Sequence, residues 1–309
     1  MKIVAVDPVT LFPEHVAILK SLGEFIQYDT EHTDDQEALD RLKDADMVVL
    51  YGAHIPGEII SQLDTTKLII VCAAGYDWVD IASAKKKGIV VTHCPGSNGE
   101  AVSEFTFGLL LEAARNSFDA AKRAATGEYS HAGYRGKELR GKTLGIIGYG
   151  TIGKRVAEIA QTGFDMKVIS TNSKSTRGDL ENLLKNSDFI SINAPSNEHT
   201  KNLIGKKELA LTKKGVVLVN TGRGAVIDEE ALYESLKSGH IHGAGLDVMH
   251  VEPFVKDHRL FSLPNVVITP HIAYNTEETD FRLSAQIAEI AQSFVEGNTK
   301  YVIAEMKIS

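Results

Sequence analysis

The chain has 309 residues, of which 43% are hydrophobic and 24% are charged, and this balance is typical of a globular protein rather than a disordered or fibrous one. A chain of this length favours two domains over a single core. The formal net charge of −8 and the lack of a long Lys/Arg run argue against a nucleic acid or an anionic membrane as the partner.

The cysteines and the N-terminus bear on the compartment. Cys72 and Cys94 each end an apolar run, so buried free thiols are favoured over a disulfide, and a reducing cytoplasm is expected. Asp7 and Pro8 interrupt the apolar stretch at the N-terminus, which argues against a signal peptide or a membrane span.

The first third of the chain alternates short apolar runs with amphipathic segments of helical length. The runs predicted to be strands are Lys2–Val6, Phe25–Tyr28, Met47–Tyr51, Leu68–Cys72 and Ile89–Thr92. This alternation predicts a parallel sheet with helices on both of its faces.

A longer amphipathic segment follows, from about Glu100 to Gly127. Phe105 and Leu109 recur there at helical spacing, and Asn98 can cap the N-terminus, so the segment is predicted to form one long helix. The next stretch, Tyr129–Lys142, has no apolar periodicity and is predicted to be a loop between two units.

A second alternating series begins after that loop. Its predicted strands are Thr143–Ile147, Lys167–Ser170, Phe189–Asn193, Val216–Asn220, Ala244–Val248 and Val266–Ile268. The series therefore predicts a complete doubly wound sheet, and the protein as a whole is expected to be an α/β protein with two parallel-sheet domains. The last segment, Glu277–Glu296, is helical, and its expected buried stripe consists of Phe281, Ile287, Ala291 and Phe294.

A glycine pattern follows the first strand of the second series. Gly148, Gly150 and Gly153 form G-x-G-x-x-G between the strand Thr143–Ile147 and the helical segment Lys154–Gln161. In this context the first glycine permits a tight turn, the second lets the backbone approach a pyrophosphate, and the third lets the helix pack closely on the strand. The pattern predicts a dinucleotide at the helix N-terminus.

The residue expected to bind the adenosine ribose is unusual. An acidic residue normally lies about twenty positions after the glycine pattern, whereas this chain has Asn172, followed by Ser173 and Lys174, with Arg177 nearby. A neutral amide, a hydroxyl and cations suit a 2′-phosphate, so NADP(H) is favoured over NAD(H). The alternative is a surface loop whose Asn172 still bonds the ribose of NAD.

Three later fragments, each after a predicted strand, carry the chemistry of hydride transfer to a keto acid. Arg223 can hold the substrate carboxylate with its planar fork. His271 can protonate the developing alkoxide, and Glu252 can fix the tautomer of that imidazole. Because the carboxyl ends of parallel strands share one crevice, these three side chains are predicted to meet beside the nicotinamide.

Other histidines are weaker candidates. His250 lies two residues from Glu252 and is the closest rival as proton donor, although it falls in an irregular loop. His240 and His242 have no carboxylate or cysteine at ligand spacing, so no metal site is predicted. Taken singly, Arg223, Glu252 and His271 could each be an ordinary loop residue; their joint occurrence beyond a dinucleotide pattern favours a catalytic site.

With these motifs the chain resembles the D-isomer-specific 2-hydroxyacid dehydrogenase family, which includes glyoxylate/hydroxypyruvate reductases and D-lactate and phosphoglycerate dehydrogenases. The resemblance covers nearly the whole chain. Its most specific parts are Leu144–Gly153, Val219–Asp228, Gly245–Val248, Glu252-Pro253 and Thr269–Ile272.

The resemblance implies roles for individual residues. Arg223 takes the place of the substrate arginine, Glu252 of the orienting glutamate and His271 of the proton donor. The positions implied to bind the cofactor, together with the three glycines and residues 172–174, are Thr151, Ile152, Ala194, Pro195, Thr200, Thr221, Asp247 and Ala273. Those implied to contact the substrate, besides Arg223 and His271, are Tyr51, Gly52, Ala74 and Gly75.

The resemblance also implies an architecture. Residues 1–95 and 276–309 would form a flavodoxin-like substrate domain, residues 96–275 a Rossmann NAD(P)-binding domain, and the active site would lie between them. Family members commonly form homodimers through the long helix that would start near Glu100. The expected function is hydride transfer between NAD(P)H and C2 of a small 2-keto or 2-hydroxy acid, with D stereochemistry.

The chain departs from the family pattern at two places. Asn172 replaces the usual acidic residue, and Ala273-Tyr274 follow the histidine where small glycines are frequent. Two rival functions stay open: a dinucleotide-sensing binding protein with little turnover, and an oxidoreductase of another acid such as an amino acid. Glyoxylate, hydroxypyruvate and pyruvate analogues all remain candidate substrates.

Overall fold

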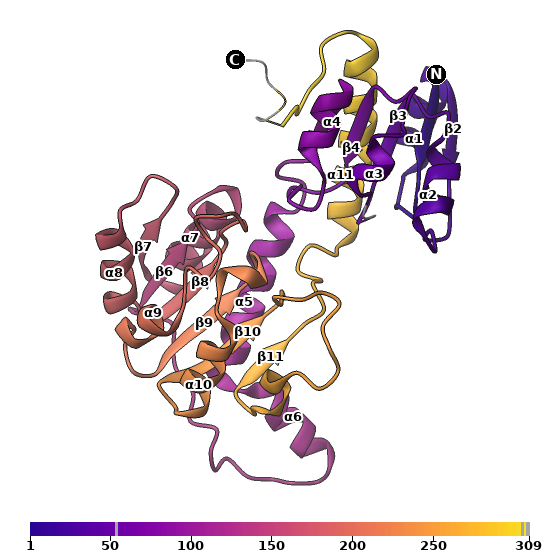
Figure 1. The fold of residues 1–309 in the computed structure, drawn as a ribbon. Helices are drawn as coiled ribbons and strands as arrows, with labels where there is room; N and C mark the ends of the chain where they lie inside the picture. The colour runs from indigo at the N-terminus through magenta and orange to yellow at the C-terminus, as the bar shows by residue number, and fades with distance from the viewer. Residues whose placement is uncertain (53–54, 304–305, 307–309) are drawn as a thin grey trace. The chain divides into compact units, whose positions relative to one another are not determined.

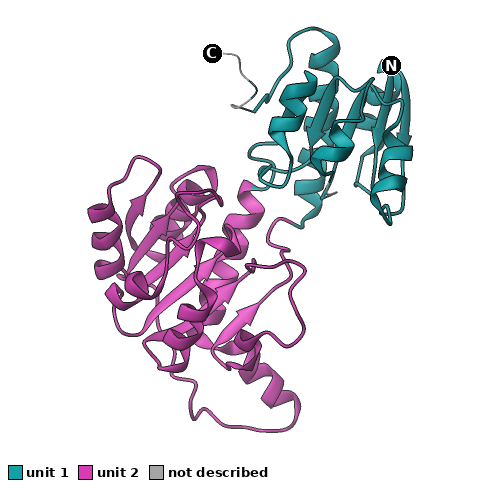
Figure 2. Cartoon of the chain, viewed as in Figure 1, with its two compact units in different colours: residues 1–98, 275–309 teal, residues 99–274 magenta. Residues whose placement is uncertain are grey.

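The computed structural model describes residues 1–52, 55–303 and 306. The chain divides into two compact units, residues 1–98 with 275–309 and residues 99–274 (Figures 1 and 2). The predicted boundaries were 95/96 and 275/276. Each unit is an α/β layer structure built on a parallel sheet, as the alternation of apolar runs and helices predicted.

Unit 1 contains, within the described residues, a five-stranded sheet of order β2-β1-β3-β4-β5 in which every pair is parallel. Its strands are β1 (Lys2–Ala5), β2 (Glu24–Gln27), β3 (Met47–Leu50), β4 (Leu68–Val71) and β5 (Val90–His93). The central strands β3 and β4 are buried at every position, because helices cover both faces of the sheet. These five strands agree with the predicted ones to within one residue at each end.

The helices of unit 1 are α1 (Pro13–Leu22), α2 (Asp35–Leu42), α3 (Gly57–Ile60), α4 (Ile81–Lys87) and α11 (Glu277–Val295). Helix α11 returns from the end of the chain to this unit, where Ile287 and Ala291 join the core around Ile3 and Leu68. The predicted stripe was wrong at Phe281, whose side chain is 44% exposed. It packs against Phe12 at 5.0 Å between ring centroids instead of entering the core.

Unit 2 contains, in the part of the chain that is described, a six-stranded parallel sheet of order β11-β10-β9-β8-β6-β7. Its strands are β6 (Thr143–Ile147), β7 (Lys167–Thr171), β8 (Phe189–Ile192), β9 (Val216–Asn220), β10 (Ile241–Leu246) and β11 (Val266–Ile268). This is the predicted doubly wound sheet, although β10 begins three residues before the predicted start at Ala244.

The helices of unit 2 cover both faces of this sheet, and each face has its own apolar core. They are α5 (Gly99–Arg115), α6 (Ser117–Ala125), α7 (Thr151–Phe164), α8 (Arg177–Asn186), α9 (Lys206–Leu211) and α10 (Glu229–Lys237), with the short 3₁₀ turns η1 (Gly224–Val226) and η2 (Arg259–Ser262).

The single long helix predicted over Glu100–Gly127 was wrong, because the segment forms two helices. Asn116 between α5 and α6 has φ +51°, a left-handed conformation that ends a right-handed helix and that asparagine tolerates better than most residues. Asn98 does not cap α5 as predicted, since its buried Oδ1 has no hydrogen-bond partner. Helix α6 buries none of its residues.

Two further properties of the described residues bear on the sequence predictions. None of their helices combines the length and apolar character needed to cross a membrane. Cys72 and Cys94 are free and buried, as predicted, and burial raises the pKa of the Cys94 thiol to about 12.

Candidate active site

The glycine pattern lies at the turn between β6 and α7. Gly148 has φ +99°, and a Cβ at this position would lie 2.6 Å from the backbone nitrogen of Ala194, so only glycine fits. The backbone N–H of Gly148 donates to the Thr171 carbonyl at 3.0 Å. The turn is therefore held between the ends of β7 and β8.

The N-terminus of α7 suits an anionic group. Gly150 is its N-cap and supplies no side-chain cap, and the first turn carries no acidic residue. A Cβ on Gly150 would meet no atom of the described residues within 4 Å, so the backbone here borders open space. The first N–H groups of the helix have no intrahelical acceptor, and a dinucleotide pyrophosphate can bind them.

Residues 172–174 form a tight turn after β7. Asn172 Oδ1 accepts from the Lys174 N–H at 2.9 Å, so this oxygen is already used by the turn. Ser173 and Lys174 are exposed. Arg177, the second cation predicted to bind a 2′-phosphate, instead forms ion pairs with Glu208 and Glu181.

The loop after β8 supports the glycine turn from the other side. Ala194 is 4% exposed. Thr200 Oγ1 donates to the Pro195 carbonyl at 2.6 Å and accepts from the Asn197 N–H at 2.9 Å, which closes the loop on itself. Pro195 and Thr200, two of the residues predicted to line the cofactor, are thus joined in one hydrogen-bonded loop.

The turn that carries Arg223 follows β9 and is shaped by Asn220. The Asn220 side chain, 1% exposed, donates from Nδ2 to the Arg223 carbonyl at 2.9 Å and accepts the Gly222 N–H at 3.0 Å. A Cβ on Gly224 would lie 2.0 Å from the carbonyl carbon of Met249, so the turn packs directly against the segment that leads to Glu252. Sequence reasoning missed Asn220, although its place just before the Arg223 turn was a signal.

Thr221, in the same turn, is 8% exposed. Its Oγ1 lies 2.9 Å from Oγ1 of Thr106 in α5 and 3.3 Å from Oδ1 of Asn193. Sequence reasoning also missed Thr106, because its position in the chain gave no sign of this contact.

His271 and Glu252 meet, as predicted from their places after β11 and β10. His271 Nδ1 donates to Glu252 Oε2 at 2.7 Å, and Glu252 Oε1 accepts the Met249 N–H at 2.9 Å. Burial raises the pKa of Glu252, but the hydrogen bonds from His271 and Met249, with the nearby charge of Arg223, outweigh burial and lower that pKa overall. Among the described residues no group bonds to His271 Nε2, so this nitrogen is available for proton transfer.

Asp247, 1% exposed, holds the segment around His271. Its Oδ1 accepts from Thr269 Oγ1 at 2.7 Å and from the Ile272 N–H at 2.9 Å, and its Oδ2 accepts from the Ala273 N–H at 2.9 Å. The Asp247 carbonyl accepts the His271 N–H at 2.9 Å. His271 itself has φ +53°, a conformation that these bonds impose on it.

The competing histidines have other surroundings. His250 is exposed, and its backbone N–H donates to Glu229. His240 Nε2 lies 3.0 Å from both Thr212 Oγ1 and the Leu209 carbonyl, a structural arrangement. Within residues 1–52, 55–303 and 306, no group of His, Cys, Asp and Glu could hold a metal ion.

The predicted substrate-contact residues of unit 1 follow β3 and β4. Tyr51 is partly buried against the core, and Gly52 has φ +78°. Ala74 and Gly75 lie in the loop after β4, where His93 Nδ1 donates to the Ala74 carbonyl at 2.9 Å. This bond attaches the loop to the end of β5.

Known proteins share this sequence and fold. Residues 107–273 match the family model of the D-isomer specific 2-hydroxyacid dehydrogenase, NAD binding domain. The chain is 39% identical to a hydroxypyruvate reductase of Thermotoga maritima over 86% of this chain and 90% of that protein. It is 38% identical to a glyoxylate reductase of Aeropyrum pernix over 93% of this chain and 91% of that protein.

Solved structures agree with these relatives. An acyclic imino acid reductase in complex with NADPH and D-arginine superposes with a TM-score of 0.90 at 34% identity, covering 98% of this chain and all (100%) of that chain. The resemblance and the fold class expected from the motifs are confirmed. The chain belongs to the D-isomer-specific 2-hydroxyacid dehydrogenase family.

Proposed function

We propose that the chain reduces a small 2-keto acid to the D-2-hydroxy acid with NADPH. His271 acts as the proton donor, Glu252 orients it and Arg223 binds the substrate carboxylate. The observation that carries this proposal is the 2.7 Å hydrogen bond between His271 and Glu252, in the unit that also carries the glycine turn. When bound, the reduced nicotinamide supplies the hydride.

The proton comes from His271. Its Nδ1 is occupied by Glu252, so Nε2 carries the proton that passes to the substrate carbonyl oxygen as that oxygen becomes a hydroxyl. The Glu252 carboxylate stabilises the imidazolium before transfer and keeps the ring in one orientation. Asp247 fixes the backbone next to His271 by accepting the N–H groups of Ile272 and Ala273.

Arg223 binds the substrate. Its guanidinium is half-buried in a turn that Asn220 holds from within, and two parallel N–H groups can bind a carboxylate. Its positive charge also polarises the keto group next to that carboxylate. Ala74, Gly75, Tyr51 and Gly52 are proposed to contact the substrate from unit 1.

The cofactor preference rests on residues 172–174. Asn172 carries no negative charge to repel a 2′-phosphate, and Ser173 and Lys174 are exposed beside it. Arg177 is left out of this proposal because it pairs with Glu208. A structural relative with NADPH bound supports the choice.

The test follows the loss of reduced-cofactor absorbance with NADPH and with NADH in parallel, against glyoxylate, hydroxypyruvate, pyruvate and larger 2-keto acids. We expect turnover with a small acid, a higher kcat/KM with NADPH, and a D product by chiral chromatography. Each acid is also assayed with added amine, since one relative is an imino acid reductase. Tight cofactor binding without any turnover would overturn the proposal in favour of a dinucleotide sensor.

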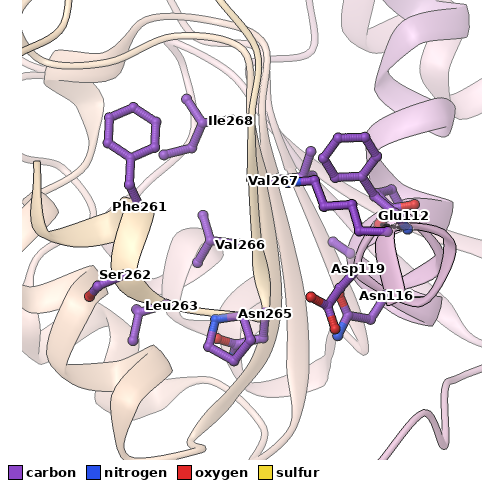
Figure 3. Close-up of a pocket in the computed structure, with 14 residues that line it drawn as sticks. Glu112, Asn116, Asp119, Phe261, Ser262, Leu263, Asn265, Val266, Val267 and Ile268 are labelled. Carbon is purple, nitrogen blue, oxygen red and sulfur yellow. Dashed lines mark hydrogen bonds between the residues drawn. The ribbon is translucent and has the colours of Figure 1, made fainter. Parts of the chain in front are cut away.

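We further propose a homodimer in the cytoplasm. Helix α6 buries no residue on its own chain, and Phe118 on it is 55% exposed. Beside it lies a cavity of about 320 Å³, which Phe261, Val266 and Ile268 line together with α5 and α6 (Figure 3). A second copy would cover these apolar groups. The free thiols of Cys72 and Cys94 support a reducing compartment.

Sedimentation of Phe118→Asp tests the dimer. The variant should be monomeric at micromolar concentration, whereas wild type and the control Val295→Asp should sediment as dimers. Val295 is comparably exposed at 46% but lies at the end of α11. A monomeric wild type would refute the assembly while leaving the proposed reaction untouched.

A further inference from the structure

Three segments far apart in sequence meet at the turn that carries Arg223. Thr106, in the middle of α5, is fully buried at 0% exposure. Its Oγ1 lies 2.7 Å from the Val102 carbonyl one helical turn earlier and 2.9 Å from Thr221 Oγ1. Thr221 Oγ1 also lies 3.3 Å from Asn193 Oδ1, after β8.

The number of hydroxyl protons limits how many of these contacts can be hydrogen bonds at the same time. The two hydroxyls supply two protons for three contacts. The two shorter contacts are satisfied when Thr106 donates to the Val102 carbonyl, a common arrangement for threonine in a helix, and Thr221 donates to Thr106. The third contact, of 3.3 Å to Asn193 Oδ1, is then left without a proton.

This arrangement determines the direction in which the Thr221 hydroxyl donates its hydrogen bond. With its proton directed into the protein toward Thr106, the Thr221 oxygen keeps its lone pairs for an outside donor. Asn193 Oδ1 is a second acceptor beside it, while Asn193 Nδ2 donates to Ser191 Oγ at 3.0 Å. Two adjacent acceptors fit a ligand that presents hydroxyl groups, as the ribose of a dinucleotide does.

The same contact anchors the start of the Arg223 turn. Thr221 lies two residues before Arg223, and its backbone N–H donates to the Ile192 carbonyl at 3.2 Å. The Asn220 side chain holds the turn by two hydrogen bonds to its backbone. Thr106 holds it from α5 through the contact with Thr221. Any shift of Thr221 would move both the oxygen proposed to face the cofactor and Arg223, the proposed substrate-binding arginine.

We propose that Thr106 is a positioning residue: it accepts a hydrogen bond from the Thr221 hydroxyl, leaves the Thr221 oxygen as an acceptor for the cofactor, and fixes the turn that carries Arg223. This inference rests on the proposed reductase function. Thr106 is buried and touches no substrate or cofactor in this role; it acts through Thr221.

The test compares Thr106→Val, Thr106→Ser and Ser187→Ala. Valine keeps the volume but removes the hydroxyl, whereas serine keeps the hydroxyl. Ser187 is an equally buried control that directly follows α8, and its hydroxyl donates to the Leu183 carbonyl of that helix at 2.7 Å. We measure kcat, the KM of the keto acid, and the Kd of NADPH by the fluorescence of its reduced nicotinamide.

Thr106→Val should weaken NADPH binding and lower kcat/KM by about 3- to 10-fold each, the effect of one lost buried hydrogen bond. Thr106→Ser should recover to within about 2-fold of wild type, and Ser187→Ala should match wild type in both. A valine variant with wild-type Kd and kcat/KM, or a serine variant as impaired as valine, would overturn the proposal.

A double variant can still distinguish the proposed role of Thr106 if Thr106→Val also lowers the stability of the protein. Since Thr106 acts through Thr221, Thr106→Val should have no further effect on Kd in the Thr221→Val background. Losses that multiply would show that Thr106 acts independently and would refute the inference. A wild type with no turnover would instead refute the proposed function, and the Kd measurements would still decide the role of Thr106.

Discussion

Glu252 Oε2 lies 2.7 Å from His271 Nδ1, and Glu252 Oε1 accepts the Met249 N–H at 2.9 Å. Both carboxylate oxygens are therefore occupied by donors, and the ring of His271 is held with Nε2 open. The two side chains are 35% and 40% exposed, which leaves the pair reachable by a substrate.

Replacing His271 should remove the proton donor. His271→Gln is expected to lower kcat by roughly 10²- to 10⁴-fold while the Kd for NADPH stays near wild type. The control is His250→Gln, which should retain wild-type kcat because His250 is an exposed loop residue. If His250→Gln is the inactive variant, the proton donor has been misassigned.

Glu252 should affect stability in acid. Its folded pKa is lowered from an ordinary value of 4.5, so the folded state favours the ionised carboxylate. That contribution is complete above pH 4.5 and is lost as the pH falls through the lowered pKa. The Tm difference between wild type and Glu252→Gln, measured by calorimetry, should be largest near neutral pH and should shrink as the pH falls below 4.5. A Tm difference that does not change with pH would contradict a stabilising role of the ionised carboxylate.

Arg223→Lys should raise the KM of the keto acid and lower kcat, because a lysine ammonium cannot make the bidentate contact of a guanidinium. We expect a loss of about 10- to 100-fold in kcat/KM, the range for a hydrogen bond to a charged group. Arg140→Lys, at an 82% exposed site paired with Asp165, is the matched control. Equal kinetics for the two variants would remove Arg223 from the site.

Lys174 is predicted to bind the 2′-phosphate of NADPH. Lys174→Ala should raise the KM of NADPH by about 10-fold and leave the KM of NADH unchanged, because only NADPH carries the extra charge. Lys185→Ala, whose lysine pairs with Glu181 in α8, should affect neither cofactor. An equal loss with both cofactors would mean that Lys174 contacts a part they share.

Asp247→Asn should destabilise unit 2. The asparagine amide nitrogen replaces one of the two buried oxygens. In the place of Oδ2 it cannot accept the Ala273 N–H, and in the place of Oδ1 it cannot accept the Ile272 N–H or the Thr269 hydroxyl. We expect a loss of about 2 kcal/mol in the free energy of unfolding, with a lower kcat because the His271 backbone loosens. Denaturant unfolding measures the first quantity, and an unchanged midpoint would show that the hydrogen bonds of Asp247 do not stabilise the segment around His271.

Much of this protein was predictable from local sequence. Buried parallel strands read as continuous apolar runs, and short turns separate them from helices, so the strands of both sheets were placed to within a few residues. Strand ends in a parallel sheet share one edge, which is why Glu252 and His271 could be predicted to meet across 19 positions.

Other features were decided only by the tertiary structure. Asn116 breaks the predicted long helix through its left-handed backbone, although the apolar periodicity runs through it unchanged. Arg177 was available by composition for a phosphate, but Glu208 reaches it from another helix. Thr106 and Thr221 are 115 residues apart, and periodicity predicts that a helix face is buried without identifying the partner of each hydroxyl. Such pairings depend on how helices are placed over the sheet, which is determined by packing across the whole unit rather than by neighbours in the chain.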